Sequence, residues 1–179
     1  MRLILTLFVI ALTVVGSAQS DIPWDATQRL SWDDFEKRVG QGGYFKAYTY
    51  SGIRYSVDSP NGYVKIDVEA YFVADESWVY RGHMNTHLLQ HEQAHFDITE
   101  IYARKMRKAM ADYEVSARTF MNNGYMRDVK RLYNDIYSDM EAKQKEYDRA
   151  TDHSMRRNAQ REWVEWIESE IAALAEYAK

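Results

Sequence analysis

The chain has 179 residues, contains no cysteine and carries a formal net charge of −4 at pH 7. The lack of cysteine excludes a disulfide framework and a lipid anchor on cysteine. The mildly acidic balance excludes a basic surface for nucleic acid and a polybasic patch for a membrane surface. Five tryptophans and fourteen tyrosines argue against disorder. A chain of this length is expected to fold as one domain with its own core.

Residues 1–18 have the pattern of a signal peptide. Arg2 gives a positive start, residues 3–15 are apolar, and Gly16-Ser17-Ala18 places small residues before the expected cleavage point. The apolar run is too short for a confident membrane span, and an uncleaved N-terminal anchor is the alternative. We therefore expect residues 19–179 to form a single exported domain, periplasmic or secreted, without a stable membrane anchor after cleavage.

Strands are predicted in the N-terminal half. Residues 21–28 are expected to form an extended lead-in, and Ser31 is a suitable N-cap for one helical turn over residues 30–35. Residues 45–57 and 63–73 are rich in aromatic and β-branched side chains, which favour strands.

A turn signal, Ser59-Pro60-Asn61-Gly62, separates these two segments. Apolar and charged residues alternate along the second segment, which predicts one buried face and one exposed face. The apolar members of the alternation are Val64, Ile66, Val68, Ala70 and Phe72. A loop is expected over residues 40–43, and a short strand or tight connection over residues 76–79.

Helices are predicted in the C-terminal half. Three segments with apolar side chains at helical spacing are residues 88–108, 127–149 and 156–177. Asn85 or Thr86 can cap the first of them, and residues 151–154 interrupt the pattern between the second and the third. The predicted class is α+β, with a small antiparallel sheet in the N-terminal half followed by three α-helices.

The first predicted helix carries an HExxH motif, His91-Glu92-Gln93-Ala94-His95. Histidines at i and i+4 lie one turn apart on one face, so both can reach a single metal ion. They leave coordination positions for a third protein ligand and a water molecule, from which Glu92 lies near enough to take a proton. A chance match occurs in about one sequence in a hundred of this composition. The motif therefore favours a zincin-like zinc-peptidase helix.

Carboxylates on the same helix are poor candidates for the third ligand. On a straight helix Asp97 and Glu100 face away from His91. Together with Arg104, they are expected to form surface or inter-element salt bridges.

A remote residue is a better candidate. His87 faces the correct side, but it lies about 12 Å along the helix axis from His95, too far for one ion to bind both together with the histidine between them. The remaining remote histidine is His153, in the break between two helices, where a side chain can be directed at another element. Asp148 and Asp152 are the carboxylate alternatives.

These motifs resemble the DUF922 family, bacterial proteins with HExxH and YDxxTxH motifs that are expected to be secreted zinc proteases. The resemblance covers nearly all of the chain after residue 18 and is strongest in two segments, residues 91–104 and 147–153. In the second segment the family pattern reads YDxxTxHG, which matches His153 to the family's histidine and has Ser154 in place of its glycine. The resemblance implies that His153 is the third ligand.

Two further residues of this segment have candidate roles. Asp148 is a candidate acceptor behind a metal ligand, where it would fix the tautomer of that ligand. Tyr147 is a candidate donor to the oxyanion that develops during hydrolysis. The alternative for the pair is a core tyrosine and a carboxylate at a helix end.

The predicted function is that of a zinc-dependent metallopeptidase. His91, His95 and His153 would hold one Zn²⁺, and Glu92 would act as general base toward the zinc-activated water during hydrolysis of a peptide or protein substrate. An edge strand within residues 63–73 is expected to hold the extended peptide. The alternatives are a non-catalytic, metal-stabilised binding or structural domain and a hydrolase of cell-wall amide bonds.

Overall fold

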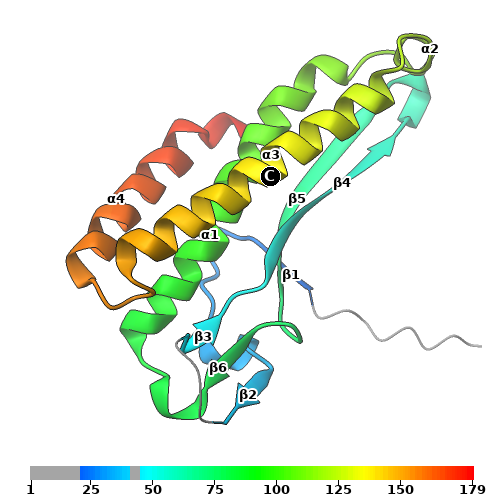
Figure 1. Cartoon of the computed structure of the whole chain (residues 1–179). Helices are drawn as coiled ribbons and strands as arrows, with labels where there is room; N and C mark the ends of the chain where they lie inside the picture. The colour runs from blue at the N-terminus through cyan, green and yellow to red at the C-terminus, as the bar shows by residue number, and fades with distance from the viewer. Residues whose placement is uncertain (1–20, 41–44) are drawn as a thin grey trace, which may run out of the picture.

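Strands precede helices along the chain, as Figure 1 shows for the computed structural model, which describes residues 21–40 and 45–179. This order confirms the predicted α+β class. The predicted signal peptide, residues 1–18, and residues 41–43 of the predicted loop lie outside the described residues. The predicted helical turn after Ser31 is present, and Asp34 completes a capping box with that serine.

The longer sheet is antiparallel and has the strand order β1-β5-β4. Its strands are β1 (Asp21–Pro23), β4 (Ser51–Asp58) and β5 (Lys65–Val73). The predicted alternation holds in β5, where Ile66, Val68, Ala70 and Phe72 are buried. β5 is the middle strand of this sheet, and β1 pairs with its last three residues, Tyr71–Val73. Elsewhere on β5, Ile66 N donates to Glu114 and Val68 O accepts from Arg107, and the expected peptide binding at an edge strand within residues 63–73 stays a prediction.

The smaller sheet is mixed and has the order β2-β6-β3. Its strands are β2 (Lys37–Val39), β3 (Ala47–Tyr48) and β6 (Trp78–Tyr80). The predicted strand over residues 45–57 therefore divides between two sheets. Ser77, which is fully buried, joins them: its Oγ accepts from Tyr50 N at 2.9 Å and donates to Val73 O at 2.7 Å.

Three long helices follow the strands, as predicted, and a short one lies between the first two. They are α1 (Thr86–Met110), α2 (Ala117–Asn122), α3 (Tyr125–Thr151) and α4 (Arg157–Ala173). Asn85 is the N-cap of α1 and accepts from Leu88 N through its side chain. In the described part of the chain, no helix is both long and apolar enough to cross a membrane.

Helix α1 lies at the centre of the fold. It contacts β4 and β5 of the longer sheet, and it also contacts α3 and α4 (Figure 1). Ile98, Ile101, Ala103 and Met106 on this helix are fully buried. Because α1 is covered from several directions, most of its polar residues between His91 and Arg104 are buried as well.

The salt bridge predicted between Glu100 and Arg104 is present, and it is buried rather than exposed. Glu100 Oε1 lies 2.8 Å from Arg104 Nε and 3.0 Å from Arg107 Nη1. The two arginines also donate to the carbonyls of Ile171 and Tyr177, each at 2.8 Å. The cluster therefore fastens the C-terminal segment to α1.

Replacement of Glu100 by alanine is expected to lower the free energy of unfolding by about 3 kcal/mol, because it leaves two arginines with no carboxylate in a buried site. Urea denaturation followed by circular dichroism measures the change. The matched control is Glu76→Ala, which breaks an exposed pair with Lys37 and should cost at most about 1 kcal/mol. Equal losses in both variants would contradict the assignment.

Candidate metal centre and cleft

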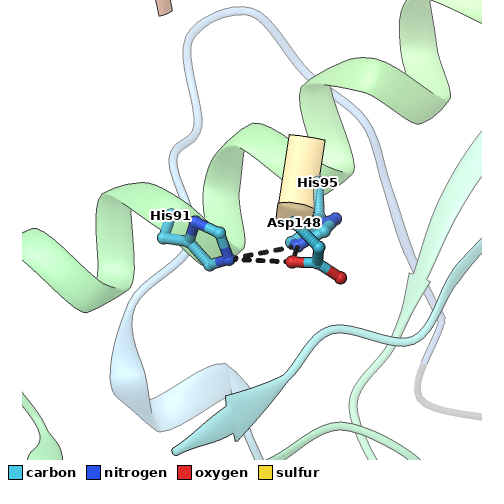
Figure 2. Close-up of side chains that lie close together, drawn as sticks. All are labelled: His91, His95 and Asp148. Atoms are coloured by element: carbon cyan, nitrogen blue, oxygen red, sulfur yellow. Dashed lines mark hydrogen bonds and ion pairs between the residues drawn. The ribbon is translucent and has the colours of Figure 1, made fainter. Parts of the chain in front are cut away.

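Two turns of α1 and the C-terminal part of α3 bring three potential ligand atoms together (Figure 2). The Nε2 atoms of His91 and His95 lie 3.3 Å apart. Asp148 Oδ1 lies 3.2 Å from the first of these nitrogens and 3.0 Å from the second. The two imidazoles come from one helix and the carboxylate from another, so helix packing assembles the group.

These separations fit a metal ion. Zinc bonds to nitrogen and oxygen are about 2.0–2.1 Å long, so neighbouring ligand atoms of a tetrahedral site are about 3.3 Å apart. The three observed separations are 3.0, 3.2 and 3.3 Å. His91, His95 and Asp148 therefore form a group that could hold a metal ion.

Gln144 supplies a second argument for a cation at this site. Its Nε2 donates to His95 O at 2.9 Å, and its Oε1 accepts from His95 Nδ1. Neutral His95 consequently has its lone pair on Nε2, which faces the acceptor Oδ1 of Asp148. Two acceptors 3.0 Å apart require a proton or a metal ion between them.

Burial and mutual contact shift the pKa values of the group in different directions. Burial lowers the pKa of His91 to about 4, so this imidazole is neutral near pH 7. Burial acts the same way on His95, but the hydrogen bond to Asp148 and the charge of that carboxylate outweigh it and raise the pKa. Burial would raise the pKa of Asp148, yet the two histidines lower it. Asp148 is therefore ionised and gives the group the negative charge that a cation needs.

Glu92, the acid of the HExxH motif, is buried beside this group. Its Oε2 accepts from Thr49 Oγ1 at 2.8 Å, and its side chain lines the same cleft as the three potential ligands. Burial raises its pKa to about 7. A carboxyl group with such a pKa can both take and return a proton at neutral pH.

A cleft of about 410 Å³ lies over the group. Residues 45–51, which include β3, form one wall, and α3 contributes the other. The floor comes from α1 through Leu88, His91, Glu92 and His95. The potential metal ligands and the buried acid therefore face a space that a small substrate segment can enter.

His153, predicted as the third ligand, lines this cleft but is not a member of the three-atom group. Its Nδ1 lies 3.3 Å from Asp148 Oδ1. Asp148, one of the carboxylate alternatives, is thus the third member of the group, and a ligand role for His153 stays a prediction. The reason is geometric: Asp148 lies in the last turns of α3, which packs directly on α1, whereas His153 lies in the loop that follows.

The loop that carries His153 has an unusual backbone. Asp152, His153 and Ser154 have φ values of +50°, +49° and +74°, all in the left-handed region. His87 Nε2 donates to Ser154 O at 2.7 Å and so holds the loop against α1. His87 was considered from the sequence as a metal ligand; in the structure it holds this loop in place. The φ of Ser154 also explains the glycine in the family pattern, because glycine adopts this region without strain.

Tyr147 is fully buried. Its ring stacks on His91 with centroids 4.6 Å apart and packs against His95 and Trp163. Its hydroxyl has no hydrogen-bond partner among the described residues, and Tyr147 is not among the residues that line the cleft. This position favours the packing role, and the oxyanion role stays a prediction.

Two residues of the site, Thr49 and Gln144, were not predicted from the sequence. Gln144 could have been found, because it precedes Asp148 by four residues on the same face of a predicted helix. Thr49 gives no comparable signal, since its contact with Glu92 depends on how a strand packs on a helix.

Together these features define an α+β domain whose central HExxH helix carries a possible His/His/Asp metal-binding group. Residues 73–154 match the model of a family described as "Bacterial protein of unknown function (DUF922)", and this match supports the assignment of the chain to the DUF922 family. The family predicted from the motifs is thus confirmed over a segment that contains α1, α2 and α3. No curated protein and no solved structure matches the chain.

Replacement of Gln144 by leucine is expected to weaken zinc binding by about 10- to 100-fold, because His95 loses the acceptor that fixes its tautomer. Competition with a chromophoric chelator measures the dissociation constant. Gln90→Leu, which makes the same change at an exposed position on α1, should leave it unaltered. If Gln144→Leu binds zinc as tightly as the wild type, the tautomer argument fails.

Replacement of Ser154 by glycine is expected to raise the free energy of unfolding by about 1 kcal/mol, because a left-handed conformation costs a non-glycine residue about 1–2 kcal/mol. Urea denaturation measures the gain. Ser154→Ala removes the same hydroxyl but keeps the β-carbon, so it should give no increase. A similar gain in both variants would mean that backbone strain is not its source.

Proposed function

We propose that the protein is a zinc-dependent peptidase in which His91, His95 and Asp148 hold one zinc ion and Glu92 is the general base. The observation that supports this proposal is the convergence of three ligand atoms in a cleft that also contains a buried acid with a pKa near 7. Imidazole and carboxylate donors at these separations suit zinc. In this proposal His153 contacts Asp148 and is not itself a ligand.

Zinc, when bound, would lower the pKa of a water molecule and polarise the carbonyl of the substrate. Glu92 would take a proton from the attacking water as the new C–O bond forms. It would then give that proton to the nitrogen of the leaving amine as the C–N bond breaks. Thr49 would hold the Glu92 carboxyl toward the cleft through its 2.8 Å hydrogen bond.

The alternative of a structural metal site is less well supported. Structural zinc sites usually fill all four positions with protein ligands, and the group found in the described part of the chain has three members. A purely structural site also has no use for an acid in the position of Glu92. We further propose, from the pattern of residues 1–18, that the protein is exported.

The ligand assignment is tested by the metal content of purified, zinc-loaded variants. We expect about one zinc ion per chain in the wild type and its loss from His91→Ala, His95→Ala and Asp148→Ala. His153→Ala should keep zinc, as should the control His83→Ala, which alters an exposed histidine before α1. Loss of zinc from His153→Ala with retention in Asp148→Ala would restore the ligand set expected from the sequence.

The catalytic assignment is tested with fluorescently labelled casein. Glu92→Gln should keep zinc and lose hydrolysis by at least about 100-fold, because the amide cannot take a proton. Glu146→Gln, on an exposed part of α3, should keep both. Full activity in Glu92→Gln, or wild-type activity that survives complete removal of the metal, would overturn the proposed function.

A further inference from the structure

Large apolar side chains are exposed together at one place beside the site. Phe45, Tyr48 and Tyr50 keep 50%, 47% and 42% of their surface accessible, and all three line the cleft. In residues 21–40 and 45–179, the other large apolar side chains with high exposure lie outside the cleft; they are Tyr63, Met84, Met121, Met126 and Met155. An apolar patch that gathers beside a candidate site marks a surface for ligand contact.

Two of these tyrosines are the chain neighbours of Thr49, the residue that contacts the proposed general base. Ala47 is buried and Thr49 contacts Glu92, so these two residues face α1. Tyr48 and Tyr50 precede and follow Thr49 in the chain, and all three residues line the cleft. The two rings therefore flank the residue that holds Glu92.

Neighbouring rings keep this surface in place. Tyr48 stacks on Trp78 with centroids 6.3 Å apart and planes 27° apart, and it meets Tyr50 edge-on at 6.4 Å. Trp78 in turn packs against Tyr80 at 5.2 Å. Pairing of β3 with β6 fixes the strand beneath. A surface that is rigid before binding loses little freedom when a ligand covers it.

The facing wall offers apolar area as well. Tyr137 and Met140 of α3 line the cleft opposite this segment, and Leu88 of α1 contributes to the floor. Apolar and aromatic groups thus surround the polar group formed by the two histidines, Asp148 and Glu92. A substrate that places its scissile bond at the polar group brings its adjacent side chains into the same cleft as the aromatic rings.

We infer that this wall, formed by Tyr48, Tyr50 and Trp78, selects polypeptide segments that carry a large apolar or aromatic side chain beside the scissile bond. The inference rests on the proposed peptidase function and adds the substrate class. Such a side chain covers the exposed rings, whereas a small polar side chain leaves them in water.

The test measures binding separately from hydrolysis, with zinc-loaded Glu92→Gln as the binding protein. Two synthetic dye-labelled octapeptides are compared by fluorescence anisotropy; they are identical except for phenylalanine or serine at the centre. We expect the phenylalanine peptide to bind at least about tenfold more tightly, the range that apolar pockets give for a lost side-chain contact. Introducing Tyr48→Ser and Tyr50→Ser into the same protein should abolish the difference.

Controls separate recognition from folding. Tyr63→Ser removes a tyrosine that is 66% exposed and lies outside the cleft, so it should keep the preference. The single variant Tyr50→Ser replaces the double variant if the latter loses its native circular dichroism spectrum. Equal binding of the two peptides, or no binding of either, would overturn the inference.

Hydrolysis distinguishes the two proposals. Mass spectrometry of casein digested by the wild type should show cleavage beside large apolar residues. Cleavage without this preference, together with equal peptide binding, leaves the peptidase proposal standing and rejects the inference. Preferential binding of the phenylalanine peptide without any metal-dependent cleavage rejects the peptidase proposal and supports the aromatic wall as a recognition surface.

Discussion

A buried polar group needs a hydrogen-bond partner inside the protein. In this fold most such groups belong to side chains of α1. Most of the buried polar residues of the described chain lie on this helix, and several of them bond to other segments. Gln93 accepts from Leu30 N at 2.7 Å, Asp97 pairs with Arg29, and Thr99 shares a hydrogen bond with Ser51. The polar contacts of α1 therefore fix the lead-in segment and the sheet relative to the HExxH motif.

The candidate metal centre follows the same rule. His91 and His95 are directed at Asp148 of α3, and Gln144 on the same face of α3 completes the bonding of His95. The side chains that pair α1 with α3 are thus also the group that could hold a metal ion. His91, His95 and Asp148 therefore contribute both to the packing of α1 against α3 and to the candidate metal centre.

The loop after α3 shows how local strain is maintained. Three consecutive residues with positive φ are costly on their own. They are held by His87 of α1 through Ser154 O and by the hydrogen bond from Arg156 N to Thr151 O at 2.8 Å. The histidine one turn before the motif thus positions the loop from which His153 reaches the cleft, a role that its spacing from His91 alone does not reveal.

The sequence by itself determined what depends on neighbours along the chain: the α+β order, the alternation in β5, the cap of α1, and the placement of His91, Glu92 and His95 on one helix. Contacts between distant segments were decided only by the tertiary structure. Asp148 completes the three-atom group, Thr49 reaches Glu92, and β1 pairs with the last three residues of β5. Helical and strand periodicities are local, whereas the crossing of α3 over α1 and the division of residues 45–57 between two sheets depend on how the whole core packs.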